Sequence, residues 1–375
     1  MGALNTLRDQ IDECDRQLVE LLAKRNHITA QVGAYKQQQG QPVYVPSRET
    51  ELIDARRSQA IAAGVSPELI EDVLRRLMRE SYQNQQLGLA CVAPHLSPMV
   101  IVGGKGSMGQ LFKRQLERSG YQVNVLDKDK QSERESLLSE ARCVIVSVPI
   151  HAVESVIADM PKLHPECLLV DITSVKSSPL KAMETHHQGP VLALHPMFGP
   201  DIPHWVKQTV VVCQNKPCEV ASSLLEQLTV WGCNLVSMDA KKHDEAMQIV
   251  QVMRHLTTFV YGQFLAKQSH SLEEIESCSS PIYHLELMMV GRLFAQSPEL
   301  YSDIMLAQFE DVAPLMKEYC EVFQQTFEKL KENDKAGLID DFAAAKTFFS
   351  DSASTFLSQS KALLSKANDS KVLDY

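Results

Sequence analysis

Several cationic and neutral polar residues in the first ninety positions stand where an apolar helical stripe would otherwise continue. Arg25 belongs to a seam whose other members recur every three or four residues, and Lys36 follows Val32 on the same side. Ser81 and Gln85 extend a second apolar stripe in the same way. Taken singly, each is also consistent with a solvated rim or a fraying helix end. Together they predict a pocket for a small, multiply carboxylated ligand, because Arg and Lys bind carboxylates through charge-assisted hydrogen bonds.

A second group of candidate residues begins about a hundred residues into the chain. Residues 99–102 are apolar, the pattern Gly104-x-Gly106-x-x-Gly109 follows, and the next apolar run ends in Asp127. A strand, a glycine turn, a helix, a strand and an acid in this order predict a dinucleotide site. We expect Gly104 to form the tight turn, Gly106 to admit the pyrophosphate and Gly109 to let helix and strand pack closely. Asp127 favours NAD over NADP, because it would accept from the ribose hydroxyls and repel a 2′-phosphate.

Reactive side chains also follow two later apolar runs. Ser174 and Lys176 come after residues 168–172, and His195 comes directly after residues 191–194. Ligands of open α/β sheets bind beyond the carboxyl ends of the strands, so His195 is a candidate base rather than a packing residue. His255 and Arg292 stand within apolar helical runs, where each alone could be a satisfied buried group or a rim group. An arginine buried in such a run needs an anionic partner, which could be a protein carboxylate or a substrate.

These residues must be positioned by elements of three kinds. The first seam predicts a helix of about 33 residues and ~50 Å, which needs a partner along its length, most simply a second copy of the chain. Two shorter helices follow, one from Ser47 to Gly64 and one capped by Ser66. Buried strands then recur, as in a doubly wound sheet, and the pattern is helical from Asp239 onward. The sequence thus predicts a multidomain chain: an all-α domain (1–90), a linker (91–98), an α/β Rossmann-like domain (99–238) and an all-α domain (239–375).

Composition limits the classes of function. The chain has 375 residues, a formal charge of −10, and no basic block typical of nucleic-acid binding. No apolar run reaches the ~18 residues of a membrane span, and no secretory signal opens the sequence. Nine scattered cysteines include no C-x-x-C pair and no zinc spacing. We therefore expect a cytoplasmic protein with reduced thiols, without a structural metal, and without a nucleic-acid or membrane partner.

The first ninety residues closely resemble the all-helical bacterial chorismate mutases. The motifs that carry the resemblance are LRDQID, LLAKR, VGAYK, PVYVPSRE and RRLMRESYQNQ. It implies an intertwined dimer that converts chorismate to prephenate. It implies that Arg25, Arg48 and, from the other subunit, Arg8 bind the two carboxylates of the substrate. Lys36 and Gln85 would lie at the ether oxygen, and Glu49 and Ser81 near the hydroxyl. Such side chains suit a Claisen rearrangement, which needs a compact reactive conformer and donors aimed at the ether oxygen.

The remainder of the chain is similar to bacterial prephenate dehydrogenase. The motifs are VIVGGKGSMG, SVPIH, DITSVK, LALHPMFGP and SSPIYHLELMMVGRLFAQ. The resemblance implies that His195 accepts the proton of the ring hydroxyl, that Ser174 orients His195 and the hydroxyl, and that Arg292 binds a carboxylate. Lys176, His243 and His255 are secondary candidates. The expected cofactor-binding residues are Gly104, Lys105, Gly106, Ser107, Met108, Gly109, Asp127, Val148 and Pro149. It also implies NAD as the cofactor, dimerisation through the C-terminal helices and feedback inhibition by tyrosine.

A mutase followed by a dehydrogenase in one chain matches the bifunctional enzymes of enteric-type bacteria. One alternative keeps the dehydrogenase but makes the N-terminal helices a catalytically silent sensing and dimerisation module. A second is an NAD-sensing transcriptional regulator with a helical DNA-binding arm. The acidic balance and the lack of a basic recognition helix disfavour this second alternative.

Overall fold

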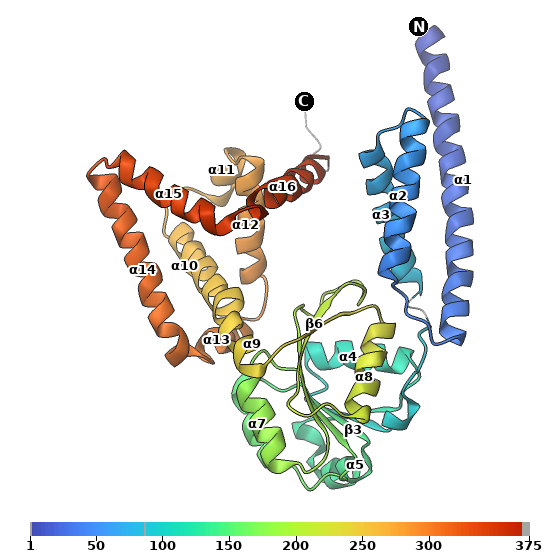
Figure 1. Cartoon of the computed structure of the whole chain (residues 1–375), viewed down its shortest axis with the longest axis vertical. Coiled ribbons are helices and arrows are strands. Elements are labelled where there is room, and N and C mark those ends of the chain that lie inside the picture. The colour runs from blue at the N-terminus through green and yellow to red at the C-terminus, as the bar shows by residue number, and fades with distance from the viewer. Residues whose placement is uncertain (1, 86–87, 370–375) are drawn as a thin grey trace. The chain divides into compact units, whose positions relative to one another are not determined.

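The computed structural model describes residues 2–85 and 88–369, which form two compact units (Figure 1). The first unit spans Met1–Asp244 and the second spans Glu245–Tyr375. None of the helices within the described ranges is both long and apolar enough to cross a membrane.

Three helices open the first unit: α1 (Gly2–Gln38), α2 (Pro46–Ala62) and α3 (Pro67–Gln85). The long first helix was predicted from its seam. Ser66 caps α3 as expected, because its hydroxyl accepts from the backbone N–H of Leu69 at 3.2 Å. Much of the apolar seam of α1 is exposed in the single chain; Leu7, Leu18 and Leu21 are each more than half exposed. The helix therefore carries an apolar face that its own chain leaves uncovered.

A seven-stranded sheet forms the centre of the unit. Its strands are β1 (Met99–Val102), β2 (Val123–Leu126), β3 (Cys143–Val146), β4 (Leu168–Asp171), β5 (Val191–Pro196), β6 (Thr209–Cys213) and β7 (Asn234–Ser237). Their order is β2-β1-β3-β4-β5-β6-β7, and every pair is parallel except β5 with β6. The predicted Rossmann-like sheet is confirmed. In this register β1 to β5 end together at one edge, which carries the glycine turn, Asp127 and His195.

Helices cover both faces of the sheet, so its strands are apolar on both sides. The helices α4 (Ser107–Arg118) and α8 (Glu219–Val230) pack on one face, against the side of the strands that includes Ile101 and Ile145. The helices α5 (Arg134–Glu140), α6 (Val153–Ala158) and α7 (Ser177–His186) contribute buried residues to the core on the other face. Short 3-10 turns connect these elements at Pro94–Leu96, Lys128–Glu133 and Ile150–Ala152.

Residues 88–98, which precede the sheet, are packed into the core. Ala93 and Leu96 are almost fully buried. Gln227 accepts from the backbone N–H of Val92 and donates to the carbonyl of Ala90. The expected linker, residues 91–98, is thus held by hydrogen bonds within the first compact unit.

The second unit is helical, as predicted. It begins within α9 (Ala240–Met247) and continues through a π-helical stretch (Gln248–Met253). The remaining helices are α10 (Arg254–Ala266), α11 (Leu272–Ser277), α12 (Pro281–Phe294), α13 (Pro298–Leu306), α14 (Phe309–Lys331), α15 (Lys335–Phe349) and α16 (Ser352–Asp369). π-helical stretches are often found at functional sites, and this one lies between His243 and His255 in the chain.

Candidate active sites

The glycine turn after β1 forms a cradle that side chains would fill. A Cβ on Gly109 would lie 2.7 Å from the Cα of Gly104 and 2.8 Å from the carbonyl oxygen of Gly103. Gly106 is the N-cap of α4, so the backbone N–H groups of Ser107 and Met108 open that helix. A helix N-terminus with closely approaching backbone suits a pyrophosphate. The left-handed residue of the turn is Gly103, with φ +79°, and a Cβ on Gly104 would lie 2.8 Å from Cγ1 of Val125, so the turn leaves no room for a side chain at Gly104.

A cavity of about 750 Å³ adjoins this turn. Four of the predicted cofactor residues line it: Lys105, Asp127, Val148 and Pro149. Asp127 accepts from the backbone N–H of Lys105 at 3.0 Å, which holds its carboxylate beside the glycine turn. The cradle, the acid and the cavity together fit a dinucleotide. Arg134 and His151 also line the cavity and were not predicted.

Two histidines and an aspartate form a hydrogen-bonded chain at the same edge of the sheet. Nδ1 of His195 lies 2.8 Å from Nε2 of His243, and Nδ1 of His243 lies 2.8 Å from Oδ1 of Asp244. The carboxylate of Asp244 also accepts from the backbone N–H groups of Lys176 and Ser177, both at 2.8 Å. His195 and His243 are buried. The structure thus assigns His243, a secondary candidate, a direct contact with the predicted base.

This chain of contacts determines the tautomers. A carboxylate only accepts, so Nδ1 of His243 must carry a proton for Asp244. In neutral His243, Nε2 is then an acceptor, and Nδ1 of His195 must donate to it. Nε2 of neutral His195 is left with the lone pair that can accept a proton. The arrangement therefore supports His195 as a general base.

Electrostatics keep His195 in the neutral form. Burial, with help from the nearby Lys176 and His243, holds the pKa of His195 well below 6.5. Although burial opposes it, hydrogen bonds from His243 and from Ser177 keep the pKa of Asp244 below its ordinary value. In this hydrogen-bonded series of three side chains, Asp244 is thus the charged member, and His195 is neutral.

Lys176 supports the strand ends from inside the protein. It is fully buried, and its ammonium contacts the carboxylate of Asp171 and the carbonyl oxygen of Leu194, the latter at 2.7 Å. Burial lowers the pKa of Lys176, and Asp171 opposes that shift. The ammonium thereby joins the ends of β4 and β5 next to His195. Ser174 is half-buried in the loop between β4 and α7.

His255 and Arg292 belong to the helical unit. His255 in α10 is buried against the ring of Tyr301, at 4.7 Å between centroids, and its Nδ1 has no hydrogen-bond partner among the described residues. Burial and the adjacent Arg254 lower the pKa of His255 to about 4. Arg292 in α12 is exposed in the single chain. Of the two alternatives for Arg292, a buried group or a rim group, the single chain shows an exposed position, because its helix presents that side to solvent.

A separate group of polar residues gathers between α1 and α3. The guanidinium of Arg25 donates to the Ser81 hydroxyl at 2.8 Å and to the Leu77 carbonyl at 3.2 Å. The ammonium of Lys36 donates to the Val43 carbonyl at 2.8 Å. Burial lowers the pKa of both cations. The predicted pair Arg25 and Ser81 is thus in direct contact, and both cations are partly shielded from water, where they bind anions more strongly.

Gln85 extends the same pocket. It is buried, and its Oε1 lacks a hydrogen-bond partner among the described residues. A Cβ on Gly33 of α1 would lie 2.9 Å from Cγ of Gln85. Gly33 therefore allows α1 and α3 to approach closely enough to place this amide.

Glu49 has more partners than the sequence indicated. Its carboxylate accepts from Tyr82 at 2.8 Å, from Arg75 at 3.2 Å and from Lys207 at 2.5 Å. Burial, and then the contact with Glu49, raise the pKa of Tyr82, so its hydroxyl remains a donor. Arg75 and Tyr82 lie on the same helix as Ser81, whereas Lys207 comes from the loop before β6.

Two predicted residues lie outside the group in the single chain. Arg48 is exposed, and its guanidinium lies 3.9 Å from the carboxylate of Glu51. Arg8 is also exposed, and it stands 17 residues before Arg25 on a continuous helix, or about 25 Å away. Arg8 therefore cannot reach the Arg25 pocket of its own chain.

Sequence reasoning missed several supporting residues. Asp171 is the last residue of β4, just as Asp127 directly follows β2. An acidic residue at the end of a strand could therefore have indicated Asp171 as a supporting residue. Asp244 directly follows His243 in the sequence. No local pattern marked Lys207, because its contact with Glu49 joins residues 158 positions apart.

Comparisons with known families cover most of the chain. Residues 7–86 match chorismate mutase type II. Residues 93–227 match the nucleotide-binding domain of prephenate dehydrogenase, and residues 239–344 match its dimerization domain.

Relatives and a solved structure agree with these matches. A T-protein from Enterobacter agglomerans is 49% identical over 372 residues, covering 99% of this chain and 100% of the relative. A T-protein from Haemophilus influenzae is 45% identical, covering 99% of each chain. The crystal structure of Aquifex aeolicus prephenate dehydrogenase with hydroxyphenyl propionate and NAD+ has a TM-score of 0.53 at 16% identity, covering 66% of this chain and 96% of that one. At this identity the structure supports the fold.

Proposed function

The chain belongs to the T-protein family, and on that premise we propose how its side chains divide the family's two reactions. The protein is a bifunctional enzyme of tyrosine biosynthesis. It rearranges chorismate to prephenate and then oxidises prephenate to 4-hydroxyphenylpyruvate with NAD. The assignment of individual residues and the domain limits 1–90, 91–98, 99–238 and 239–375 are our proposals.

In the dehydrogenase site His195 is the general base. Nε2 of His195 accepts the proton of the ring hydroxyl while hydride leaves the same ring carbon, and bound NAD supplies the hydride acceptor. Carbon dioxide then leaves, and the ring becomes aromatic. His243 and Asp244 hold the required tautomer of His195. Ser174 orients the hydroxyl, Arg292 and His255 bind substrate polar groups, and Lys176 keeps the ends of β4 and β5 in place.

In the mutase site the side chains hold a dianion and stabilise charge on the ether oxygen. Arg25, Arg48 and Arg8 of the second subunit bind the two carboxylates. Lys36 and Gln85 face the ether oxygen, where negative charge develops as the bond breaks. Glu49 and Ser81 contact the substrate hydroxyl. The burial that shields Arg25 and Lys36 from water supports this assignment, and Gln85 would donate to the ether oxygen through its Nε2 amide.

The assembly and its regulation follow from the same premise. We propose a homodimer, supported by the exposed apolar seam of α1 and by the match of residues 239–344 to a dimerization domain. Tyrosine inhibits the enzyme, because its phenol resembles the product ring. A cytoplasmic location is supported by the nine free thiols.

The hydrogen-bonded chain from His195 to Asp244 is the observation that carries the dehydrogenase assignment, and Asp244→Asn tests it. Asn cannot enforce the His243 tautomer, so we expect the dehydrogenase kcat to fall by about 10²-fold, with the mutase rate unchanged. Asp239→Asn is the matched control. Asp239 caps the same helix by accepting from the N–H groups of Lys241 and Lys242, and Asn caps equally well. If Asp244→Asn and the parent have equal dehydrogenase rates, the hydrogen bonds between His195, His243 and Asp244 have no role in the mechanism.

A further inference from the structure

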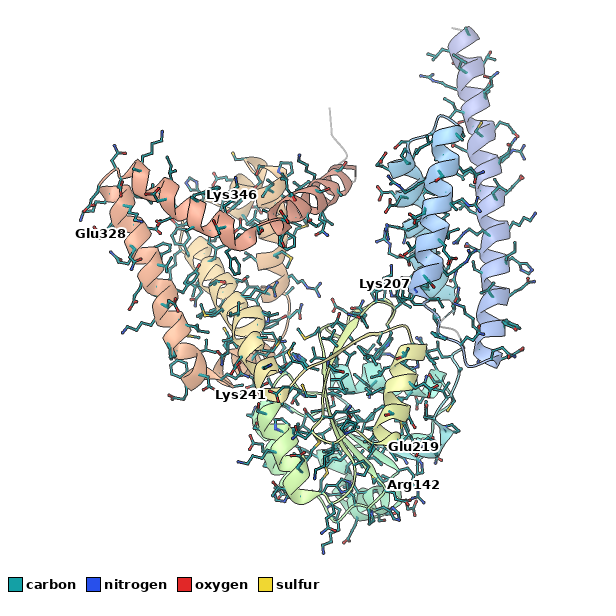
Figure 2. All side chains as sticks on the ribbon, viewed as in Figure 1. Arg142, Lys207, Glu219, Lys241, Glu328 and Lys346 are labelled. Atoms are coloured by element: carbon teal, nitrogen blue, oxygen red, sulfur yellow. The ribbon has the colours of Figure 1, made fainter. Side chains whose placement is uncertain are left out.

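A lysine of the dehydrogenase region reaches a carboxylate of the mutase region. Lys207 lies in the loop between β5 and β6, and Figure 2 labels it beside the end of the N-terminal helices. Its ammonium is 2.5 Å from Oε1 of Glu49 and 5.0 Å from the centroid of the Tyr44 ring. Glu49 is 8% exposed, so the ammonium contacts a largely desolvated carboxylate.

The backbone around Lys207 is fixed in an uncommon conformation. Lys207 has φ +63°, which side-chain-bearing residues rarely adopt. Its N–H donates to the carbonyl of Gly232 at 2.8 Å, and the neighbouring Trp205 is buried against Trp231. Gly232 has φ +86°, and a Cβ there would lie 3.1 Å from Cβ of Tyr44. A residue held in such a conformation by its surroundings often serves a site.

The other partners of Glu49 leave its Oε1 loosely held. Tyr82 engages Oε2. Arg75 donates to Oε1 at 3.2 Å, but it also contacts Glu71 at 2.7 Å and 2.8 Å, so it is shared between two acids. Lys207 supplies the shorter contact with Oε1, and it comes from outside the three helices of the mutase region.

We propose that Lys207 is a positioning residue for the mutase reaction: it fixes the carboxylate of Glu49 in the orientation that contacts the substrate hydroxyl. The dehydrogenase region thereby completes the mutase site. This inference rests on the proposed role of Glu49. Lys207 acts through Glu49 and need not touch the substrate.

Lys207→Met in the full chain tests this positioning role. Met keeps a long side chain over Tyr44 but removes the charge. We expect the mutase kcat/KM to fall by about fivefold to tenfold; the effect is modest because Lys207 is half exposed. The dehydrogenase rate with supplied prephenate should stay within about twofold of the parental value. Lys207→Arg should restore most of the loss. Lys216→Met, at an exposed lysine after β6, is the matched control and should leave both rates unchanged.

A double-mutant cycle with Glu49→Gln separates the possible outcomes. If Lys207 acts through Glu49, Lys207→Met will cause no further loss of mutase activity in the Glu49→Gln background. A parental mutase rate for Lys207→Met would overturn the inference. The inference would also be overturned if Lys207→Met lowered both activities equally, lowered the unfolding temperature and was not rescued by Lys207→Arg. The contact between Lys207 and Glu49 would then only hold the two regions together. A parental mutase rate for Glu49→Gln would instead contradict the proposed role of Glu49 itself.

Discussion

At the scale of single residues, His195 combines the features of a base with an environment that keeps it neutral. It stands at the end of β5, its Nδ1 is joined to His243, and burial holds its pKa well below 6.5. The sequence predicted the residue from its place after an apolar run. It could not predict the depth of burial, which depends on packing in three dimensions, or the tautomer, which depends on Asp244, 49 positions away in the chain.

The depressed pKa of His195 predicts the direction of the pH dependence. The base must be unprotonated, and a lowered pKa keeps it so until the pH falls well below 6.5. The dehydrogenase kcat/KM should therefore stay level from about pH 8 to about pH 6.5 and decline only at lower pH, as the imidazole gains a proton. Steady-state NADH formation over this range measures it. A decline centred above pH 7 that His195→Asn abolishes would contradict the proposed environment of the base.

At the scale of elements, the packing of α1 on α3 places Gln85. A Cβ on Gly33 would lie 2.9 Å from Cγ of Gln85, so Gly33→Ala must displace this side chain. A displacement of a few tenths of an ångström should lower the mutase kcat by about tenfold, with little effect on the dehydrogenase. Gly2→Ala in the same helix is the control, because nothing lies within 4 Å of a Cβ there. Chorismate consumption should separate the two variants, and equal rates would show that Gly33 does not position the amide.

The elements themselves were largely predictable, whereas some of their surroundings were not. Apolar periodicity and caps such as Ser66 gave the long first helix and the strands, because these signals are local. The packed segment around Ala93 and the exposure of Arg292 depend on contacts with distant residues. Hydrophobic pattern alone could not distinguish an apolar helix buried in its own chain from one whose apolar side remains exposed.

At the scale of the whole molecule, the exposed seam of α1 and the distance of Arg8 from its own pocket point to a shared mutase site. Co-expressed Arg8→Ala and Lys36→Ala chains should recover mutase activity that neither has alone. In a dimer of one chain of each kind, one site combines an intact Lys36 with the partner's intact Arg8. Random pairing makes about half of the dimers mixed, and each mixed dimer has one working site of its two. The mixture should therefore show about a quarter of the parental mutase rate.

Arg16→Ala provides the control for this complementation. Arg16 lies on the same helix and pairs with Glu13 and Glu20 of its own chain, so its loss should leave the mutase rate close to the parental value. If the mixture of Arg8→Ala and Lys36→Ala chains shows only the average of the two single variants, Arg8 does not act across the dimer.

The central claim is that one chain carries two separate active sites, and reciprocal rates in two variants test it most directly. Chorismate consumption and NADH formation from supplied prephenate should be measured on the same preparations of Lys36→Ala and His195→Asn. We predict that Lys36→Ala loses the first rate by at least about 10²-fold and keeps the second, and that His195→Asn does the reverse. A comparable loss of both rates in both variants, with folding unchanged, would contradict the account and indicate one shared site.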